Sequence, residues 1–284
     1  IYIMTKAFSS IYEAHDDHIM VVDALNLAFR YKHTNAVHFM DDYIRTIESL
    51  ARSYHCSKVI IACDSGSSSY RKEIYPDYKI ARKEKFEKQT EEEREEFEQF
   101  FREFSETIDK LNTDKRFLVL KFDRCEADDI AAYICKLLGK SYTIWLMSSD
   151  KDWDLLISDN INRFSYVTRK EITKENWSEH YEYDVDSHIS IKCLTGDSGD
   201  SIPGVSGIGP KKAMALVQQY GTTMDIIANM PIVSKYKHIQ NLNQFGVDAL
   251  MRNYQLMDLQ TFCEDALGEE NCKIIQEKLE WYLF

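Results

Sequence analysis

The chain has 284 residues, of which 44% are hydrophobic, and its formal net charge is −12. This length corresponds to about two domains, each with a core, so the composition excludes a mostly disordered chain. The longest apolar runs are strand-sized, which excludes a membrane span of roughly 20 residues, and the first residues lack the pattern of a secretory signal. The seven cysteines include no CxxC pair, so we expect free thiols in a cytosol-like compartment.

Short runs rich in Val and Ile alternate with helical patterns along the first two thirds of the chain. This alternation predicts an α/β fold, with a mostly parallel central sheet and helices on both of its faces. The expected strands are 18–22, 58–63, 116–122 and 142–147, and the clearest helices between them are 41–54 and 128–138. After about residue 190 the pattern is helical only. We therefore expect an N-terminal extension at 1–17, a sheet domain at 18–190 and a helical C-terminal domain at 191–284.

Charge is segregated between the second and third expected strands. Residues 71–88 contain seven Lys or Arg and four Asp or Glu, whereas residues 91–106 contain eight Glu and two Arg. A long basic excursion of this kind is typical of a functional loop or lid, and the acidic run indicates the solvated face of a helix. Thr90 and Glu93 predict a capping box at the start of that helix. Its apolar stripe is expected in the core and consists of Phe97, Phe100, Phe101, Phe104, Ile108 and Leu111.

Acidic side chains follow every expected strand. The ligand site of a parallel α/β sheet lies beyond the carboxyl ends of its strands, so these side chains should meet there. They are Asp23, Asp64, Glu126, Asp128, Asp129, Asp150 and Asp152, and a Gly-containing loop adds Asp197 and Asp200. Any one of them alone could instead cap a helix or a turn. Together they would repel one another strongly unless cations lie among them.

The acidic clusters contain no His or Cys, so the expected ligands are oxygen atoms, which favours Mg²⁺ or Mn²⁺ over zinc or copper. The clusters separate into two groups, which predicts two ions: Asp64, Glu126 and Asp128 belong to the first, Asp197 and Asp200 to the second, and Asp150 and Asp152 lie between them. Two such ions about 4 Å apart are suited to hydrolysing a phosphodiester.

Residues 202–217 contain three glycines that close a tight turn before an apolar-periodic helix, which is a helix-hairpin-helix pattern. The glycines let backbone N–H groups approach an oxyanion, and the start of the helix adds positive charge. The residues concerned are Gly204, Gly207, Gly209, Lys211 and Lys212. Such a hairpin binds a nucleic-acid backbone without reading bases. The alternative is a Gly-rich connector between packed helices.

In their order and spacing, these motifs resemble the 5′ nuclease, or flap endonuclease, superfamily, and within it the bacteriophage 5′-to-3′ exonucleases of the coliphage type. The resemblance covers about residues 19–258 and is carried by 21–26, 78–82, 126–129, 149–153, 196–200 and 204–212. It implies a central sheet, two divalent metal sites, and a helical arch at about 70–110 through which a single-stranded 5′ arm threads. It also implies cleavage of branched or gapped DNA that leaves 5′-phosphate and 3′-hydroxyl ends.

The resemblance also assigns roles to single residues. The first metal group becomes Asp23, Asp64, Glu126, Asp128, Asp129 and Asp150, and the second becomes Asp152, Asp197 and Asp200. Lys79 and Arg82 would face the scissile phosphate from the base of the arch, as catalytic residues. Further DNA contacts are expected from Arg30, Lys32, Tyr78 and Lys83. Tyr78 either stacks on a base or packs in the core, and Lys83, like Lys72 and Lys85, is alternatively a solvated arch charge. Ser201 follows Asp200 where many relatives have Asn.

The expected function is hydrolysis of DNA phosphodiesters at branched or 5′-ended substrates by a structure-specific 5′ nuclease in DNA replication or repair. RNA primers are a further candidate substrate. We expect two Mg²⁺ or Mn²⁺ ions, a monovalent cation at the hairpin, no membrane partner and a monomer. The expected location is the cytoplasm, that of the host cell if the chain is phage-encoded.

Three other classes of protein share part of this pattern. A PIN-type ribonuclease has the sheet and the acidic strand ends, but it is shorter and lacks the hairpin at 204–212. A haloacid-dehalogenase-type phosphatase needs Asp-x-Asp after the first strand, where this chain has Asp23-Ala-Leu-Asn26. A DNA protein that binds branches without catalysis would have lost carboxylates, and none is lost here.

Overall fold

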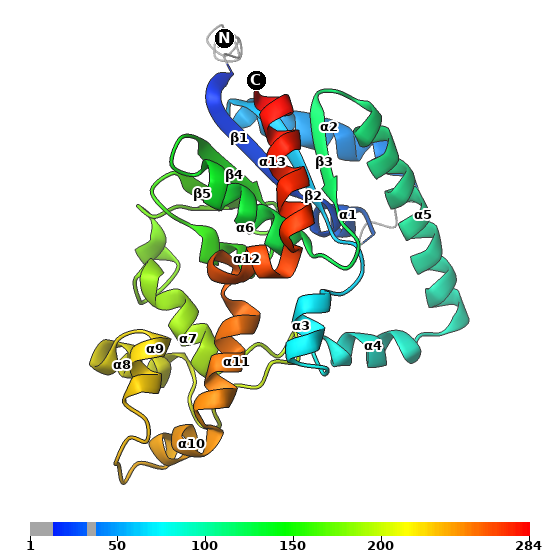
Figure 1. Cartoon of the computed structure of the whole chain (residues 1–284). Coiled ribbons are helices and arrows are strands. Elements are labelled where there is room, and N and C mark those ends of the chain that lie inside the picture. The colour runs from blue at the N-terminus through cyan, green and yellow to red at the C-terminus, as the bar shows by residue number, and fades with distance from the viewer. Residues whose placement is uncertain (1–13, 33–37) are drawn as a thin grey trace, which may run out of the picture.

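A six-stranded sheet forms the centre of the computed structural model, which describes residues 14–32 and 38–284 (Figure 1). The strand order is β3-β2-β1-β4-β5-β6, and all neighbours pair in parallel except β6, which runs antiparallel to β5. The strands are β1 (His15–Asp23), β2 (Cys56–Cys63), β3 (Phe117–Lys121), β4 (Thr143–Met147), β5 (Ile161–Ser165) and β6 (Lys170–Ile172). The predicted mostly parallel α/β sheet is confirmed. Residues 15–17 of the expected N-terminal extension belong to β1, and 1–13 lie outside the described residues.

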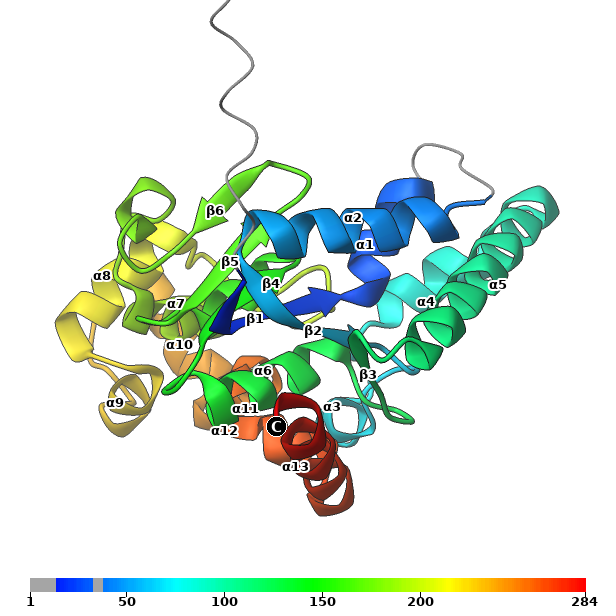
Figure 2. The same ribbon diagram turned by 90° about the horizontal axis from the view of Figure 1, so that it is seen from above.

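Helices cover both faces of the sheet (Figure 2). One face packs against α1 (Ala24–Lys32), α2 (Met40–Ser53) and α5 (Glu91–Thr113), and the other against α6 (Ala127–Leu138), α12 (Leu259–Leu267) and α13 (Glu269–Leu283). Successive strand residues point to opposite faces. In β1, for example, Ile19 and Val21 join the α6 side, whereas Met20 and Val22 join the α2 side. This explains why the buried stretches of the two central strands, 19–22 in β1 and 59–63 in β2, are apolar at consecutive positions.

The strands β5 and β6 were not predicted, because β5 contains no continuous apolar run. Its middle residue, Arg163, is only 3% exposed. The guanidinium of Arg163 donates to Asp154 at 2.5 Å and 2.9 Å, so the buried charge is paired. A charged residue in a buried strand hides the pattern from which strands are recognised.

The basic excursion, whose composition is typical of a loop or lid and which the resemblance places in a helical arch at about 70–110, is largely helical. It contains α3 (Ser69–Ile74) and α4 (Ile80–Glu87), and Figure 1 shows α4 leading away from the sheet and α5 returning to it. The predicted capping box is confirmed, because Thr90 Oγ1 accepts from the Glu93 backbone and the Glu93 carboxylate accepts from the Thr90 backbone. The predicted core stripe of α5 is confirmed at Phe100, Phe104, Ile108 and Leu111, which are buried. It is wrong at Phe101, which is 41% exposed, and at Phe97, which is only half-buried.

After β6 the chain is helical, as predicted. The short 3₁₀ helix η1 (Lys151–Leu156) joins β4 to β5 within the sheet domain, and η2 (Trp177–Glu179) and η3 (Val185–Ser187) connect the sheet to the helical region. That region has a core of its own, formed mainly by α7 (His188–Thr195), α8 (Pro210–Tyr220), α9 (Thr223–Ala228), α10 (Lys237–Phe245) and α11 (Val247–Met257). In the described part of the chain, no helix is both long and apolar enough to span a membrane.

The last two helices leave this region and pack against the sheet, so the expected helical domain at 191–284 does not form a single core. The Tyr282 hydroxyl of α13 lies 3.1 Å from the Val59 carbonyl and 2.6 Å from the Arg116 carbonyl, next to β2 and β3. The chain thus passes from the sheet to the helical region and back. This return holds α11 next to the carboxyl edge of the sheet.

Candidate active site

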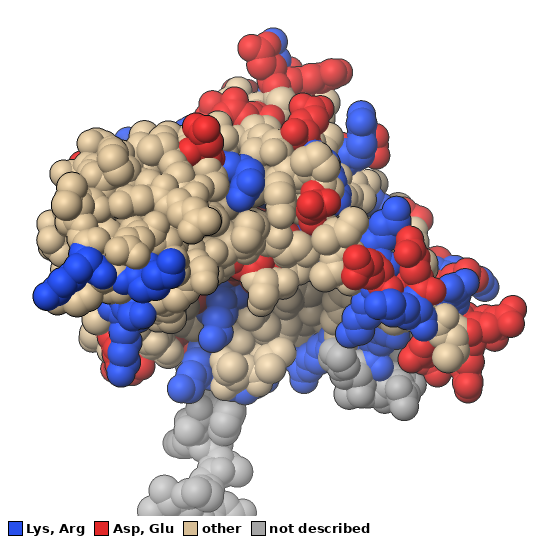
Figure 3. All heavy atoms as spheres, turned by 90° about the horizontal axis from the view of Figure 1, so that it is seen from below, with Lys and Arg blue, Asp and Glu red and all other residues tan. Residues whose placement is uncertain are grey.

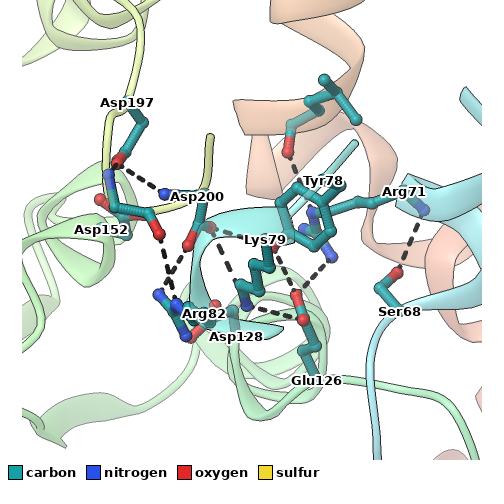
Figure 4. Close-up of polar contacts among 12 residues, drawn as sticks. Ser68, Arg71, Tyr78, Lys79, Arg82, Glu126, Asp128, Asp152, Asp197 and Asp200 are labelled. Atoms are coloured by element: carbon teal, nitrogen blue, oxygen red, sulfur yellow. Dashed lines mark hydrogen bonds and ion pairs between the residues drawn. The ribbon is translucent and has the colours of Figure 1, made fainter. Parts of the chain in front are cut away.

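The acidic residues predicted to meet do so at the carboxyl edge of the sheet. In β1, Asp23 lies opposite Ala62 of β2, and Val22 lies opposite Met147 of β4, so the three strands end together. A small hollow at this edge is lined by four of the predicted carboxylates together with Arg71 and Tyr78 (Figure 4): Asp128, Asp152, Asp197 and Asp200. The sheet domain and the helical region both contribute to this hollow.

The carboxylate of Glu126 lies at the centre of a buried hydrogen-bond network. Lys79 donates to Glu126 Oε1 at 2.7 Å, and Tyr78 and Arg71 donate to Oε2 at 2.9 Å and 3.2 Å. Burial alone would raise the pKa of Glu126, but the two cationic neighbours lower it below its ordinary value. Glu126 is therefore held as an anion, and it ties the base of the arch to α6.

Asp129, which was expected to bind the first metal ion, is engaged elsewhere. It is fully buried, and Arg71 donates to both of its oxygens, at 2.7 Å and 2.8 Å. Arg71 also donates to the Leu256 carbonyl of α11 at 3.0 Å. Because both of its oxygens already accept from the buried Arg71, we do not propose Asp129 as a metal ligand. It serves instead to join α3, α6 and α11.

Tyr78 was expected either to stack on DNA or to pack in the core, and it packs. Its ring is 2% exposed and belongs to the core of the helical region. The hydroxyl lies 3.0 Å from Asp200 Oδ2 as well as 2.9 Å from Glu126. A side chain so enclosed has no face available for a base, so the expectation of stacking is wrong.

Lys79 and Arg82 lie at the base of the arch, as the resemblance implied, and both face the acidic edge. Arg82 donates to Asp200 Oδ1 at 2.6 Å, and Lys79 Nζ is 3.9 Å from Asp200 Oδ2. The Lys79 side chain is 17% exposed, whereas that of Arg82 is 59% exposed. Lys79 therefore lies inside the site and Arg82 at its mouth.

Lys192 of α7 was missed by the sequence analysis. Its ammonium donates to Asp152 Oδ1 and lies 3.3 Å from Asp197 Oδ2, between the two carboxylates. Burial lowers the pKa of Lys192, but the two carboxylates outweigh this and raise it, so the lysine stays charged. The available signal was a single lysine within a helix whose neighbours Ile191, Cys193 and Leu194 are all apolar.

The remaining carboxylates are oriented by local donors. Ser148 Oγ donates to Asp23 Oδ2 at 2.7 Å, and the Ala127 backbone donates to Asp64 at 3.0 Å. Asp150 caps η1, where it accepts from the Asp152 backbone at 3.0 Å. None of these three carboxylates is held by a salt bridge among those found in the described residues.

These carboxylates also share a direction of pKa change. Burial, followed by repulsion from Asp64, raises the pKa of Asp23 to about 8. Burial and neighbouring carboxylates likewise raise the pKa values of Asp64, Asp128 and Asp150. Because burial and mutual repulsion disfavour the charged forms of these carboxylates, a cation bound among them would stabilise the site.

The oxygen ligands of the site fit hard divalent cations, although they do not form a preorganised coordination site. Across residues 14–32 and 38–284, no three acidic, imidazole or thiol groups converge closely enough to bind an ion as they stand. The ammonium groups of Lys79 and Lys192 partly neutralise the carboxylates instead. Because every predicted ligand is a carboxylate oxygen, Mg²⁺ or Mn²⁺ suits the site better than softer metals.

The hairpin follows directly after the last acidic loop. Gly207 has a φ of +79°, as its turn requires, and Gly209 precedes the exposed Lys211 and Lys212 at the start of α8. Gly204 has a different constraint from the one expected: a Cβ there would lie 2.0 Å from the Thr195 carbonyl oxygen, so it allows two chain segments to touch. Seen from below, Lys and Arg side chains gather along one edge of the helical region, while both signs mix over the arch (Figure 3).

The other expected DNA contacts lie on the arch side. Arg30 is exposed near the end of α1, and Lys32 Nζ lies 3.5 Å from the centroid of the Phe97 ring on α5. Lys83 is exposed on α4, where its ammonium lies 3.9 Å from Glu87. These three residues lie apart from the acidic hollow, and their contact with DNA stays a prediction.

A parallel sheet whose carboxyl edge gathers acidic side chains, beside a basic helical arch and a Gly-rich hairpin, defines a phosphodiester-cleaving nuclease. The sequence profile of the 5′-3′ exonuclease N-terminal resolvase-like domain matches residues 18–182, and that of the 5′-3′ exonuclease C-terminal SAM fold matches residues 184–279. The chain belongs to the 5′-3′ exonuclease family. The predicted class, a 5′ nuclease of the flap endonuclease kind, is confirmed.

Individual relatives agree with this assignment. The chain is 43% identical over 253 residues to the flap endonuclease of Escherichia phage T5, covering 88% of this chain and 86% of that protein. It is 29% identical to the flap endonuclease Xni of Shewanella woodyi, covering 85% and 92%. The crystal structure of the phage T5 D15 flap endonuclease, in a pseudo-enzyme–product complex with DNA and metal ions, superposes with a TM-score of 0.89 at 40% identity, covering 94% and 99%.

Proposed function

We propose that the protein cuts phosphodiester bonds near the 5′ ends of branched DNA, with the acidic edge of the sheet as its catalytic centre. The observation that carries this proposal is the grouping of carboxylates around one hollow at the sheet edge, with Lys79 and Arg82 paired to two of the acidic side chains there. It is supported by the T5 relative, whose solved complex contains DNA and metal ions.

Two divalent ions, preferably Mg²⁺, would be held by eight carboxylates in two groups. The first group is Asp23, Asp64, Glu126, Asp128 and Asp150, and the second is Asp152, Asp197 and Asp200. When bound, such ions lower the pKa of water and stabilise charge on the phosphate oxygens. The phage T5 5′-exonuclease also has a solved structure with bound divalent zinc ions, which supports a divalent requirement without selecting magnesium.

Lys79 and Arg82 would supply positive charge where the scissile phosphate enters. A phosphodiester that approaches the carboxylates meets unfavourable charge, and these two side chains offset it. Lys79 is enclosed and already aligned on Glu126, so its charge acts where water is largely excluded. Arg82 is more exposed and closer to the mouth, where it would bind the neighbouring phosphate.

The hairpin and the arch would hold the two arms of the substrate. Exposed Lys211 and Lys212 at the start of α8 would bind the duplex backbone, and a 5′ single strand would pass between α4 and α5. Gly207 and Gly209 would bring backbone N–H groups to the same phosphates. The expected monovalent cation would bind at this turn.

We also propose a cellular location and an oligomeric state for the enzyme. All seven cysteines are free and buried, which supports a reducing cytoplasm. A monomer is part of the proposal, and sedimentation of the free protein checks it.

A substrate panel tests the proposed function. The protein is incubated in Mg²⁺ with a 5′-labelled flap, a 3′ flap, a linear duplex, single-stranded RNA and an RNA primer on DNA. We expect the 5′ flap to be cut fastest, near its branch. Preferential cleavage of single-stranded RNA, as from a PIN-type ribonuclease, would contradict the proposal, and so would binding of the flap with no cleavage of any substrate.

A further inference from the structure

Several side chains of η1 and its N-cap residue make polar contacts, each with a different partner. Asp150 caps the helix, Asp152 pairs with Lys192, and Asp154 pairs with the buried Arg163. Between the last two lies Trp153, whose side chain is completely buried. Its indole Nε1 donates a hydrogen bond of 2.6 Å to Asp128 Oδ1.

Asp128 lies in the first turn of α6 and lines the acidic hollow. Its neighbours in sequence are oriented by charged partners: Glu126 by Lys79 and Arg71, and Asp129 by Arg71. Asp128 differs from them because the Trp153 indole, which donates to it, is uncharged. An aspartate has two rotatable side-chain bonds, and a fixed donor at 2.6 Å restricts both.

The chemistry of the donor decides what this contact can do. An indole N–H donates and cannot accept, so it holds a carboxylate oxygen and no cation. It also brings no charge that a divalent ion would have to displace, unlike the ammonium groups of Lys79 and Lys192. It therefore orients Asp128 both before and after an ion binds.

We infer that Trp153 is a positioning residue, which holds the Asp128 carboxylate in the orientation that binds a divalent ion at the sheet edge. The inference rests on the proposed function and deepens it. Because Trp153 directly follows Asp152, one short helix then orients a ligand of each proposed group. Groups that orient a ligand typically change metal affinity or activity by roughly 10-fold to 100-fold when removed.

Trp177 provides a matched control for the replacement of Trp153. It is 4% exposed, and its indole Nε1 also donates a 2.6 Å hydrogen bond, but to the backbone carbonyl of Tyr183. Its ring stacks on Tyr181, in a small cluster separate from the acidic hollow. Trp153→Phe and Trp177→Phe therefore each remove a buried indole and a hydrogen bond of the same length. Only Trp153→Phe removes a donor to a carboxylate.

The experiment measures Mg²⁺ binding without DNA, by calorimetry and by tryptophan emission, and then the single-turnover cleavage of a 5′ flap against Mg²⁺ concentration. We expect Trp153→Phe to weaken Mg²⁺ binding and to raise the half-saturating Mg²⁺ concentration by about 10-fold or more. Trp177→Phe should leave both within about twofold of the wild type, although both variants lose some thermal stability. The tryptophan emission of Trp177→Phe should change when Mg²⁺ is added, because Trp153 is still present. Most of that change should be absent in Trp153→Phe.

Equal Mg²⁺ dependence of the two variants would overturn the inference. If Trp153→Phe does not fold, wild-type emission still decides, because it should respond to Mg²⁺ and this response should be lost in Asp128→Asn. An unchanged response in Asp128→Asn would also overturn the inference. A different result would contradict the proposed function itself. If Asp128→Asn and Asp200→Asn both keep wild-type Mg²⁺ affinity and cleavage, the acidic edge is not the catalytic centre, whatever the behaviour of Trp153.

Discussion

Lys79 has an uncommon backbone conformation for a residue with a side chain. Its φ is +57°, in the left-handed region, and it directly precedes α4. Its backbone N–H donates to the Asp200 carbonyl at 2.8 Å, while its ammonium reaches Glu126. A non-glycine residue in this region costs on the order of 1 kcal/mol, so the surrounding contacts must hold it there. The conformation turns the chain sharply into the arch and the lysine into the site.

Replacement of Lys79 should therefore affect the reaction more than binding. In Lys79→Ala we expect the single-turnover rate at saturating flap to fall about 100-fold to 1,000-fold, or about 3 to 4 kcal/mol, because a charge beside the scissile phosphate acts mainly in the transition state. The dissociation constant for the flap should change only a few-fold. Lys83→Ala, on exposed α4, is the control. A normal rate in Lys79→Ala would show that this lysine is only part of the arch surface.

Asp23 should make stability depend on pH. Its pKa is about 8 in the folded protein and near 3.8 when unperturbed, so between these values the folded state binds a proton that the unfolded state does not. Through this group, stability therefore falls as pH rises from about 4 to 8. In EDTA, we expect Asp23→Asn to gain stability relative to the wild type over that range, as measured by urea unfolding. A difference that does not change with pH would contradict the assignment.

Which site residues could be predicted depended on the range of their contacts. The carboxylates follow strands, so their meeting follows from the parallel sheet. Lys79 and Arg82 came from a motif resemblance. The contacts of Arg71, Trp153 and Lys192 join residues 58, 25 and 40 positions apart, and nothing in the local sequence indicates them. The pairing of Asp129 with Arg71 could not be foreseen for the same reason.

At the scale of single elements, α8 and its preceding turn combine three features of a phosphate site. The turn exposes Gly207 and Gly209, the helix begins at Pro210, and Lys211 and Lys212 lie in its first turn. Lys212 Nζ also donates to the Gly207 carbonyl at 2.7 Å, so it supports the turn as well as adding charge. Asn241 of α10 ties the turn to its neighbour by donating to the Ser206 carbonyl at 2.7 Å.

Removal of both hairpin lysines should weaken binding more than catalysis. We expect the double variant Lys211→Ala, Lys212→Ala to bind flaps more weakly whatever their sequence. The slope of log affinity against log salt concentration should fall by about one to two, because binding with fewer phosphate contacts releases fewer counterions. Saturating enzyme should restore most of the single-turnover rate. The matched control is Lys273→Ala, Lys278→Ala, two exposed lysines on α13. Unchanged affinity with a slower single-turnover rate would mean that the hairpin does not anchor the duplex.

Elements with a clear apolar pattern were predictable, and those stabilised by distant pairs were not. The strands β1 to β4 and the helices α2, α5 and α6 were expected to within a few residues. The strand β5 was hidden by Arg163, whose charge is neutralised only after Asp154 folds against it. The arch helices α3 and α4 have weak apolar faces, and α4 has no buried residue.

At the scale of the whole molecule, the return of α12 and α13 to the sheet links the two halves. Tyr282 is 8% exposed and contacts carbonyls near both β2 and β3 through one hydroxyl. This packing was not predicted, because a helical pattern alone does not show which core a helix joins. It makes the position of the helical region depend on the sheet.

Loss of the Tyr282 hydroxyl should destabilise the protein without changing its chemistry. We expect Tyr282→Phe to lower the free energy of unfolding by about 1 to 3 kcal/mol, because the buried Val59 N–H loses an acceptor and the Arg116 carbonyl loses its donor. Its cleavage rate at 25 °C should match that of the wild type. Trp281→Phe, at a side chain 70% exposed, should change stability by less than about 0.5 kcal/mol. Equal stability of the two variants, measured by urea unfolding, would show that this contact does not hold α13.

The net charge of −12 opposes the approach of DNA, and in the proposed mechanism divalent ions supply both charge balance and cleavage. The most direct test is single-turnover cleavage of a 5′-labelled flap by the wild-type protein, first in excess EDTA and then after Mg²⁺ is added beyond the chelator. We expect the protein to bind the flap in EDTA without cutting it, and Mg²⁺ to restore cleavage. Full cleavage in excess EDTA would contradict a metal-dependent mechanism at the acidic edge.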